Sequence, residues 1–501
     1  MQFIGDFWLI LSEIESEIWY FYIMKESKLF EAIQTLNRKE FADFLKFVRS
    51  PFFQEHSDII TLARVFEDFY PDLNDEILPR ERIYELVFDG AFNDLKVRHL
   101  MSDMLKLFER FVAHEIFEED EIYLEINKLN YYRTNGLDKH FTTTEKRVHK
   151  NLEKNGAYTN EEAYYKKFLL ERELNQFMSE RFTRKGASNV KNTSEALDNF
   201  FILQKLRYGC TQLNYGKVFS QSFQLLLLDE IVEHVARIDL SNEPLIRAYY
   251  YAYSMLKSPD DSSFFFGLKD ILATSTPFDI SLNIELYNFA QNYCIGYINK
   301  GQKEFFTELF QLYQLSIKND VVTYNQHLHP ADFKNIVTIA CRLEQFNWAD
   351  DFIKNYGDYL PESERENAIT INRAQMYWYE GQLSQAVRLL SRVEFNDPFY
   401  ALDAKSLLVR IYFELGEKDV LFSFCDSFKI YLKRNKLISK SHLNNHLRLI
   451  SLVSKLAKLK VGQFEKLEKI KTEIRESQGL SNKKWLIEQA QKLENELEDA
   501  Y

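Results

Sequence analysis

The sequence predicts an all-α protein built of long helices joined by short loops. Glycine accounts for only 15 and proline for only 9 of the 501 residues, whereas average usage is roughly 7% and 5%. A chain this poor in turn-forming residues cannot supply the tight turns of a β-sandwich, a β-barrel or a glycine-rich nucleotide fold. Hydrophobic residues make up 46% and aromatic residues 15% of the chain, which suffices for a large core and excludes wholesale disorder.

The formal net charge of −12 bears on the partners of the protein. An acidic chain does not attract polyanions as a whole, so a role with nucleic acid would need a local basic patch. The four cysteines lie far apart and form no CxxC pair, so neither a zinc framework nor a redox motif is expected. Isolated thiols in a large chain indicate a reducing compartment and buried packing roles. We therefore expect a cytoplasmic protein without a cofactor.

Residues 1–23 form an apolar segment that contains no Lys or Arg and is interrupted by Asp6, Glu13, Glu15 and Glu17. A signal peptide needs a positively charged start and an unbroken apolar core, and a membrane span needs about 20 apolar residues. Neither condition is met, so no membrane partner is expected. Two interpretations stay open: the natural start is Met24, or residues 1–23 form an extra amphipathic helix.

Residues 24–130 are predicted to form an N-terminal helical bundle. Apolar residues recur at helical spacing in segments that end at Ser50-Pro51 and at Pro71. A short third helix is expected over residues 80–88, because Pro79 suits its first turn and Gly90 follows its end. The clearest amphipathic stripe runs from Val97 to Val112.

Connecting helices are predicted for residues 131–240. Two helices fit residues 136–180, and a long helix fits Ala196 to about Leu213. Between them, residues 181–195 are polar and have no apolar period, so they are predicted to form a loop or linker.

An internal repeat is the strongest signal in the next segment, residues 241–436. One unit contains Ala374, Tyr377, Gly381, Ala386 and Leu390, and Pro398 opens the next. A small residue lets the second helix of a hairpin cross the first closely. A tyrosine fills the wedge between the two helices, and a glycine takes the left-handed cap without a Cβ penalty.

The same spacing recurs 35 residues later at Val409, Tyr412 and Gly416, and 34 residues earlier at Ala340, Leu343 and Asn347, where Asn would take the left-handed cap. It recurs a further 46 residues earlier at Cys294, Tyr297 and Gly301, so an insertion is expected around residues 318–330. Residues 244–275 fit a further degenerate unit.

These positions make residues 281–436 similar to tetratricopeptide repeats, which are helical hairpins of about 34 residues. The resemblance implies a right-handed α-α superhelix that follows the N-terminal bundle. Proteins of this class mostly bind peptides or protein segments in the groove lined by the first helices of successive units. The repeat register then places six residues in the groove: Lys334, Thr338, Asn372, Gln375, Tyr379 and Arg410. Asn372 would hold a ligand backbone, and Lys334 and Arg410 would pair with its carboxylates.

Residues 437–501 are predicted to form basic helices and a final capping helix that begins after Ser481. Positions 429 to 475 contain thirteen Lys and Arg residues but only three acidic residues. This basic 429–475 block suits a solvated helical end, an acidic protein surface or nucleic acid. Aromatic residues that could stack on bases are scarce there, which disfavours nucleic acid.

Motifs for chemistry are weak. No phosphate-binding loop is present, because the spacing around Gly216 is wrong. His442 and His446 lie four residues apart but lack a third ligand, so we expect two surface histidines. Glu118, Glu121 and Glu125 are expected on a solvated acidic face.

The segment 80–112 could form a helix-turn-helix with Lys96 and Arg98 near the start of its second helix, although Asp89 and Asp94 beside them would repel phosphates. The sequence therefore predicts an interaction scaffold or adaptor that binds a peptide or protein segment, and not an enzyme. The alternative is a nucleic-acid-linked regulator that uses the 429–475 block or the 80–112 segment. A third hypothesis is an enzyme with an unrecognised site in the first 240 residues.

Overall fold

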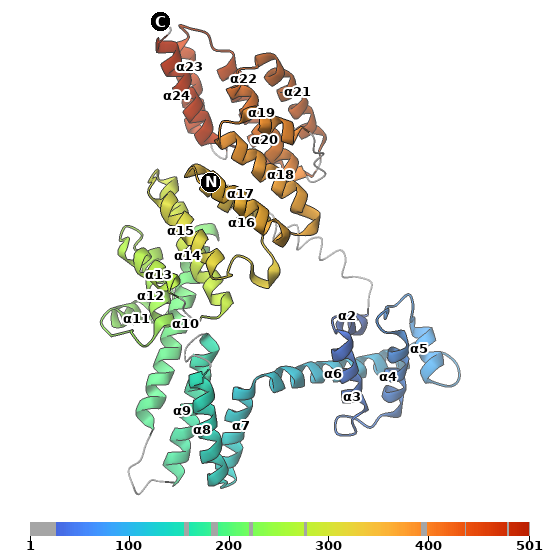
Figure 1. Ribbon diagram of the computed structural model, residues 1–501. Coiled ribbons are helices and arrows are strands. Elements are labelled where there is room, and N and C mark those ends of the chain that lie inside the picture. Colours follow the sequence, from blue (N-terminus) through green and yellow to red (C-terminus); the bar gives the residue numbers. More distant parts are fainter. Residues whose placement is uncertain are drawn as a thin grey trace. The chain divides into compact units, whose positions relative to one another are not determined.

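The computed structural model describes residues 27–154, 160–181, 189–219, 224–274, 278–391, 398–435, 437–477 and 480–499 (Figure 1). These residues form the helices α2 to α24 and two short 3₁₀-helices, η2 and η3, and contain no β-strand, so the predicted all-α fold is confirmed. The predictions for residues 1–23 lie outside the described residues. The chain divides into two compact units, residues 1–204 and 205–501.

The first part of the first unit is the N-terminal bundle. Helices α2 (Lys28–Gln34), α3 (Arg38–Arg49), α4 (Ser57–Phe69) and α5 (Arg80–Val87) all belong to one core with the long helix α6 (Asp94–Glu119). The core is rich in phenylalanine, and Phe30, Phe44 and Phe66 are fully buried. Pro79 immediately precedes α5, as expected, because its missing N–H costs nothing at a helix start.

Helices α7 (Glu121–Thr134), α8 (Asp138–Lys154) and α9 (Glu161–Arg181) form the second part of this unit, and their core includes Leu129, Phe141 and Leu170. The prediction that Glu125 lies on a solvated acidic face is wrong. Its side chain is buried and forms ion pairs with Lys128 and Arg147. The cationic partners on both sides replace the water that an isolated carboxylate would require.

The polar linker predicted for residues 181–195 is wrong at both of its ends. Arg181 ends α9, and the segment from residue 190 onward begins α10 (Val190–Phe219); residues 182–188 lie outside the described residues. Polar side chains here bond to α9: Thr193 Oγ1 and Asn189 Nδ2 both donate to the backbone oxygen of Glu171, at 2.9 and 3.2 Å. A polar segment can therefore be helical when a neighbouring helix satisfies its hydrogen bonds.

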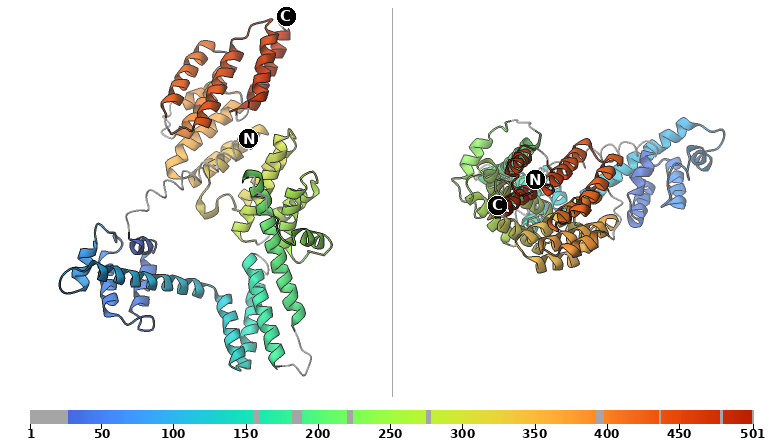
Figure 2. Two further views of the ribbon diagram at one scale, coloured as in Figure 1. Left: turned by 180° about the vertical axis from the view of Figure 1, so that it is seen from behind. Right: turned by 90° about the horizontal axis from the view of Figure 1, so that it is seen from above.

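The second unit consists of helices in consecutive contacting pairs (Figure 1). The first helices of neighbouring pairs also contact one another, as α16, α18, α20 and α22 do in sequence, and Figure 2 shows them from two further directions. The bounds are α11 (Leu228–Val235), α12 (Pro244–Lys257), α13 (Ser263–Ala273), α14 (Ile280–Asn299), α15 (Phe305–Lys318), η2 (Tyr324–Gln326), α16 (Pro330–Arg342), α17 (Phe346–Tyr356), η3 (Gly357–Tyr359), α18 (Glu362–Tyr379), α19 (Leu383–Leu390), α20 (Pro398–Glu414), α21 (Lys418–Arg434), α22 (Lys440–Ala457), α23 (Phe464–Glu476) and α24 (Lys483–Asp499).

The predicted hairpin turns of the second unit coincide with helix ends. Gly301, Gly381 and Gly416 each follow a helix and have φ values of +93°, +76° and +71°, in the region that glycine enters without steric cost. The cap predicted at Asn347 is wrong, because Asn347 lies within α17 and the residue with positive φ before that helix is Glu344, at +58°.

All four cysteines, Cys210, Cys294, Cys341 and Cys425, are free thiols in buried positions, as the sequence predicted. Burial raises the pKa of each thiol, and the pKa of Cys425 rises to about 11. A thiol in this state is protonated and packs as a small apolar group.

Candidate functional site

All six residues predicted to bind a partner lie on adjacent helices of the second unit, and all but the buried Asn372 of α18 contribute to one surface. Lys334 and Thr338 come from α16, Gln375 and Tyr379 from α18, and Arg410 from α20. We call the surface formed by these five residues the shared face. Gln375 Nε2 donates a hydrogen bond to Thr338 Oγ1 at 2.9 Å, so side chains 37 positions apart in sequence are in direct contact.

Asn372 does not have the role that the sequence predicted, and Lys334 has a partner within the chain. The Lys334 ammonium forms an ion pair with Asp403 of α20, so its charge is already compensated within the chain. Asn372 is only 2% exposed, and its Nδ2 donates to the backbone oxygen of Ala368 at 2.8 Å. Because α18 packs between α16 and α20, Asn372 faces protein and is not available to a ligand backbone.

A continuous series of cations and aromatic rings extends from the shared face. Arg410 stacks on the Trp378 ring at 4.3 Å from its centroid, and the Trp378 and Tyr379 ring centroids lie 4.6 Å apart. Arg342 lies 5.8 Å from the Tyr379 ring and 5.6 Å from the Phe306 ring. The Lys484 ammonium lies 5.5 Å from the same Phe306 ring. We call this series the cation–aromatic row; its members are Lys484, Phe306, Arg342, Tyr379, Trp378 and Arg410.

The cations of this row are only partly compensated by the chain, because Glu414 and Asp403 attract Arg410, and Glu488 attracts Lys484, without forming an ion pair among the residues that the structure describes. Within the described residues, no carboxylate pairs with Arg342, Arg410 or Lys484, and the buried Nε atom of Arg410 has no hydrogen-bond partner. Burial lowers the pKa of Arg410 and of Lys484, and the nearby charge of Arg342 lowers both further. Like charges therefore lie close together here in partly desolvated positions.

Glu414 attaches the C-terminal helix to this region. Its carboxylate accepts hydrogen bonds from Trp378 Nε1 at 2.8 Å, Trp485 Nε1 at 2.6 Å and Gln489 Nε2 at 3.2 Å. Trp485 and Gln489 belong to α24, the predicted capping helix, which also carries Lys484. These bonds place Lys484 beside helices that lie more than 100 positions earlier in the sequence.

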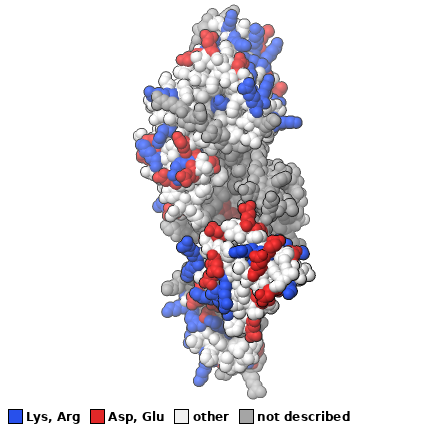
Figure 3. Space-filling view, turned by 90° about the vertical axis from the view of Figure 1, so that its right-hand side faces the viewer, with Lys and Arg blue, Asp and Glu red and all other residues white. Residues whose placement is uncertain are grey.

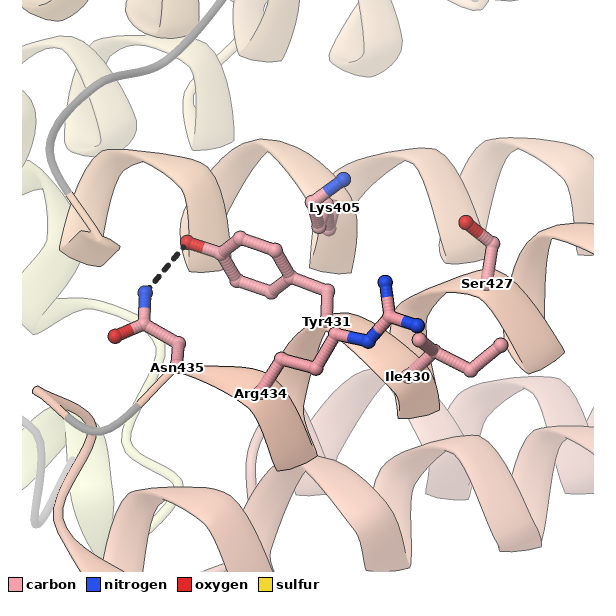
Figure 4. Close-up of a pocket in the computed structure, with 6 residues that line it drawn as sticks. All are labelled: Lys405, Ser427, Ile430, Tyr431, Arg434 and Asn435. Carbon is pink, nitrogen blue, oxygen red and sulfur yellow. Dashed lines mark hydrogen bonds between the residues drawn. The ribbon is translucent and has the colours of Figure 1, made fainter.

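An open pocket lies between α20 and α21 (Figure 4). The Lys405 ammonium lies 4.9 Å from the Tyr431 ring, and Asn435 Nδ2 donates to the Tyr431 hydroxyl at 3.2 Å. Burial lowers the pKa of Lys405. Ser427, Ile430 and Arg434 complete the lining.

The basic 429–475 block is partly neutralised by its own chain. Lys429 pairs with Asp426 at 3.0 Å, and Lys455 pairs with Glu473 at 2.6 Å. Lys471 is only 10% exposed and contacts both Glu468 and Glu494, at 2.9 and 2.7 Å. Other cations of the block are exposed, and Figure 3 shows Lys and Arg gathered toward the end formed by the C-terminal helices.

The structure also describes the surroundings of the residues in the weak metal and DNA-binding motifs. The expectation of two surface histidines is wrong for His446, which is 3% exposed and lies 3.1 Å from Ser406 Oγ through Nδ1. No group of three metal-ligating side chains occurs in the part of the chain that the structure describes. In the 80–112 segment, Asp94 pairs with both Arg80 and Arg98, at 3.2 and 2.8 Å, so Arg98 is already engaged.

The sequence indicated part of this site and missed the rest. Arg342 lies four positions after Thr338, so the helical period could have placed it on the same side of α16. Nothing in the sequence links Phe306 or Lys484 to that helix, because their contacts depend on how separate helices pack.

Comparison of the chain with family models, with curated proteins and with solved structures finds no match. Among the described helices, none combines the length and the apolar character that crossing a membrane requires.

Proposed function

We propose that the protein is an interaction scaffold that binds a peptide or protein segment on the shared face. The observation that carries the proposal is the alignment of polar and aromatic side chains from α16, α18 and α20, together with cations that have no partner within the described chain. The similarity of the repeat spacing to tetratricopeptide repeats supports it. Stacked hairpins present an extended surface that no single hairpin could form.

The chemistry of the surface suits recognition of a polypeptide. Gln375, whose Nε2 is held by Thr338, offers its side-chain carbonyl oxygen to a ligand backbone, and Tyr379 offers an aromatic surface that is amphipathic and rigid. Arg410 supplies a guanidinium that can bind a carboxylate through two N–H groups. We propose no catalytic role. The four buried thiols are compatible with the reducing conditions of the cytoplasm, where we propose that the protein acts.

A double variant of the shared face tests this function. We expect the protein to capture one or more partners from a lysate and the Gln375→Ala/Tyr379→Ala variant to lose them, because the variant removes an amide and a ring without changing the net charge. The matched control is Gln382→Ala/Tyr324→Ala, which changes the same residue types at exposed positions elsewhere. Circular dichroism verifies that both variants retain their helicity.

Equal capture by the native protein and both variants would show that the shared face is not the binding surface. Salt-dependent binding of RNA or DNA that neither variant alters would favour the nucleic-acid alternative.

A further inference from the structure

We propose that the cation–aromatic row binds the carboxylates of an acidic protein segment, so that the partner of the scaffold is recognised by its Asp and Glu side chains. The inference rests on the proposed function, because it assigns a chemistry to the partner of the same surface. It adds Arg342 of α16 and Lys484 of α24, which the repeat register did not include, to Arg410 of α20.

The carboxylates near the row are engaged elsewhere or lie too far away to pair with it. Both oxygens of Glu414 accept hydrogen bonds from the two indoles and from Gln489. Asp403 pairs with Lys334. Glu488 influences Tyr379 and Lys484 electrostatically but forms no ion pair with the cations of the row within the described residues. Arg342 and Lys484, whose side chains are exposed, are therefore available to an external anion, whereas Arg410 is half-buried.

The rings determine how such an anion would approach. Phe306, Tyr379 and Trp378 cover the faces of the cations, and a cation over a ring is stabilised but keeps its N–H groups for other acceptors. A planar guanidinium binds a carboxylate through its edge with two parallel hydrogen bonds. A carboxylate placed between Arg342 and Lys484, which share the Phe306 ring, would also relieve the repulsion between these cations.

The distribution of charge favours an acidic polypeptide over a nucleic acid. Carboxylates lie near the cations of the row, since Glu414 and Asp403 act electrostatically on Arg410 and Glu488 acts on Lys484. A continuous phosphate backbone would meet these carboxylates and be repelled. Side-chain carboxylates of a peptide are separated along its length and can contact the cations alone, and apolar side chains between them would contact the rings.

Fluorescence anisotropy with a labelled peptide of alternating Glu and Phe residues tests the inference on the full chain. We expect the native protein to bind this peptide. The Arg342→Gln/Lys484→Gln variant should bind it with an affinity reduced by about tenfold or by a larger factor, because two charge-assisted contacts are lost. Both positions are exposed, so the variant should fold normally. The control Lys96→Gln/Lys458→Gln removes two exposed lysines that also lie over rings, Phe88 and Phe422, and should bind like the native protein.

The matched peptide with Gln in place of Glu separates charge from apolar contact, and we expect it to bind far more weakly. Equal affinity of the native protein and the Arg342→Gln/Lys484→Gln variant for the Glu peptide would overturn the inference. Tighter binding of a single-stranded oligonucleotide than of the Glu peptide, lost in the same variant, would also overturn it. If Gln375→Ala/Tyr379→Ala loses its captured partners but the Glu peptide does not bind, the inference fails and the proposed function stands.

Discussion

Replacing Glu414 with alanine is expected to destabilise the C-terminal helices by about 3–5 kcal/mol, because three hydrogen bonds to a charged acceptor are lost. The two indole N–H groups and the Gln489 amide would lose their common partner, and α24 would separate from α18 and α20. Urea unfolding followed by tryptophan fluorescence measures the loss, since Trp378 and Trp485 report on the region directly.

Glu417→Ala is the matched control, because Glu417 is an exposed glutamate in the loop that follows α20; it should change the stability by less than about 0.5 kcal/mol. Trp485→Phe keeps the ring packing but removes one donor, so it should cost about 1–2 kcal/mol. If Glu414→Ala unfolds at the same urea concentration as the Glu417→Ala control, Glu414 does not hold α24.

The second large expected effect is a loss of folding stability at acidic pH. His446 is buried beside Ser406 and Phe428, and burial lowers its pKa from 6.5 to about 4, with Asp403 opposing the shift and His442 adding to it. The unfolded chain binds this proton more readily than the folded chain. Stability is therefore complete above pH 6.5 and falls as the pH decreases toward about 4. The total loss from this group is about 3 kcal/mol.

The His446→Gln variant isolates this contribution. Its stability should change little between pH 6.5 and 5, whereas the native protein should lose stability across that interval. His442→Gln changes the same residue type one turn earlier on α22 and should keep the native pH dependence. Parallel stability–pH curves for the native protein and His446→Gln would contradict the prediction.

The helices could be predicted because local signals mark where they begin and end. Pro79 and Gly381 act within their own turns, so their effect depends only on neighbouring residues. The error at Asn347 has a local cause as well: Glu344 enters the left-handed region at +58° before the position at which Asn was expected to do so. The repeat register derived from residue types therefore located the hairpin correctly. It placed the helix cap at Asn347, three residues after the residue that adopts the left-handed conformation, Glu344.

The site could be predicted only in part, because a helical period describes one helix at a time. It placed Gln375 and Thr338 on facing sides of α18 and α16, and they are hydrogen-bonded. It could not show that Asn372 is enclosed between helices, or that Lys334 is compensated by Asp403. It also could not bring Lys484 to Phe306, since that contact arises from the attachment of α24 through Glu414.

The four enclosed thiols provide a built-in set of probes for local opening. Cys210, Cys294, Cys341 and Cys425 lie on α10, α14, α16 and α21, and a protonated, inaccessible sulfur reacts with an alkylating reagent only after its surroundings separate. The rate of thiol alkylation at each position then measures how often the structure around that cysteine opens. A bound partner that rigidifies α16 would lower the alkylation rate of Cys341 and leave the alkylation rate of Cys210 unchanged.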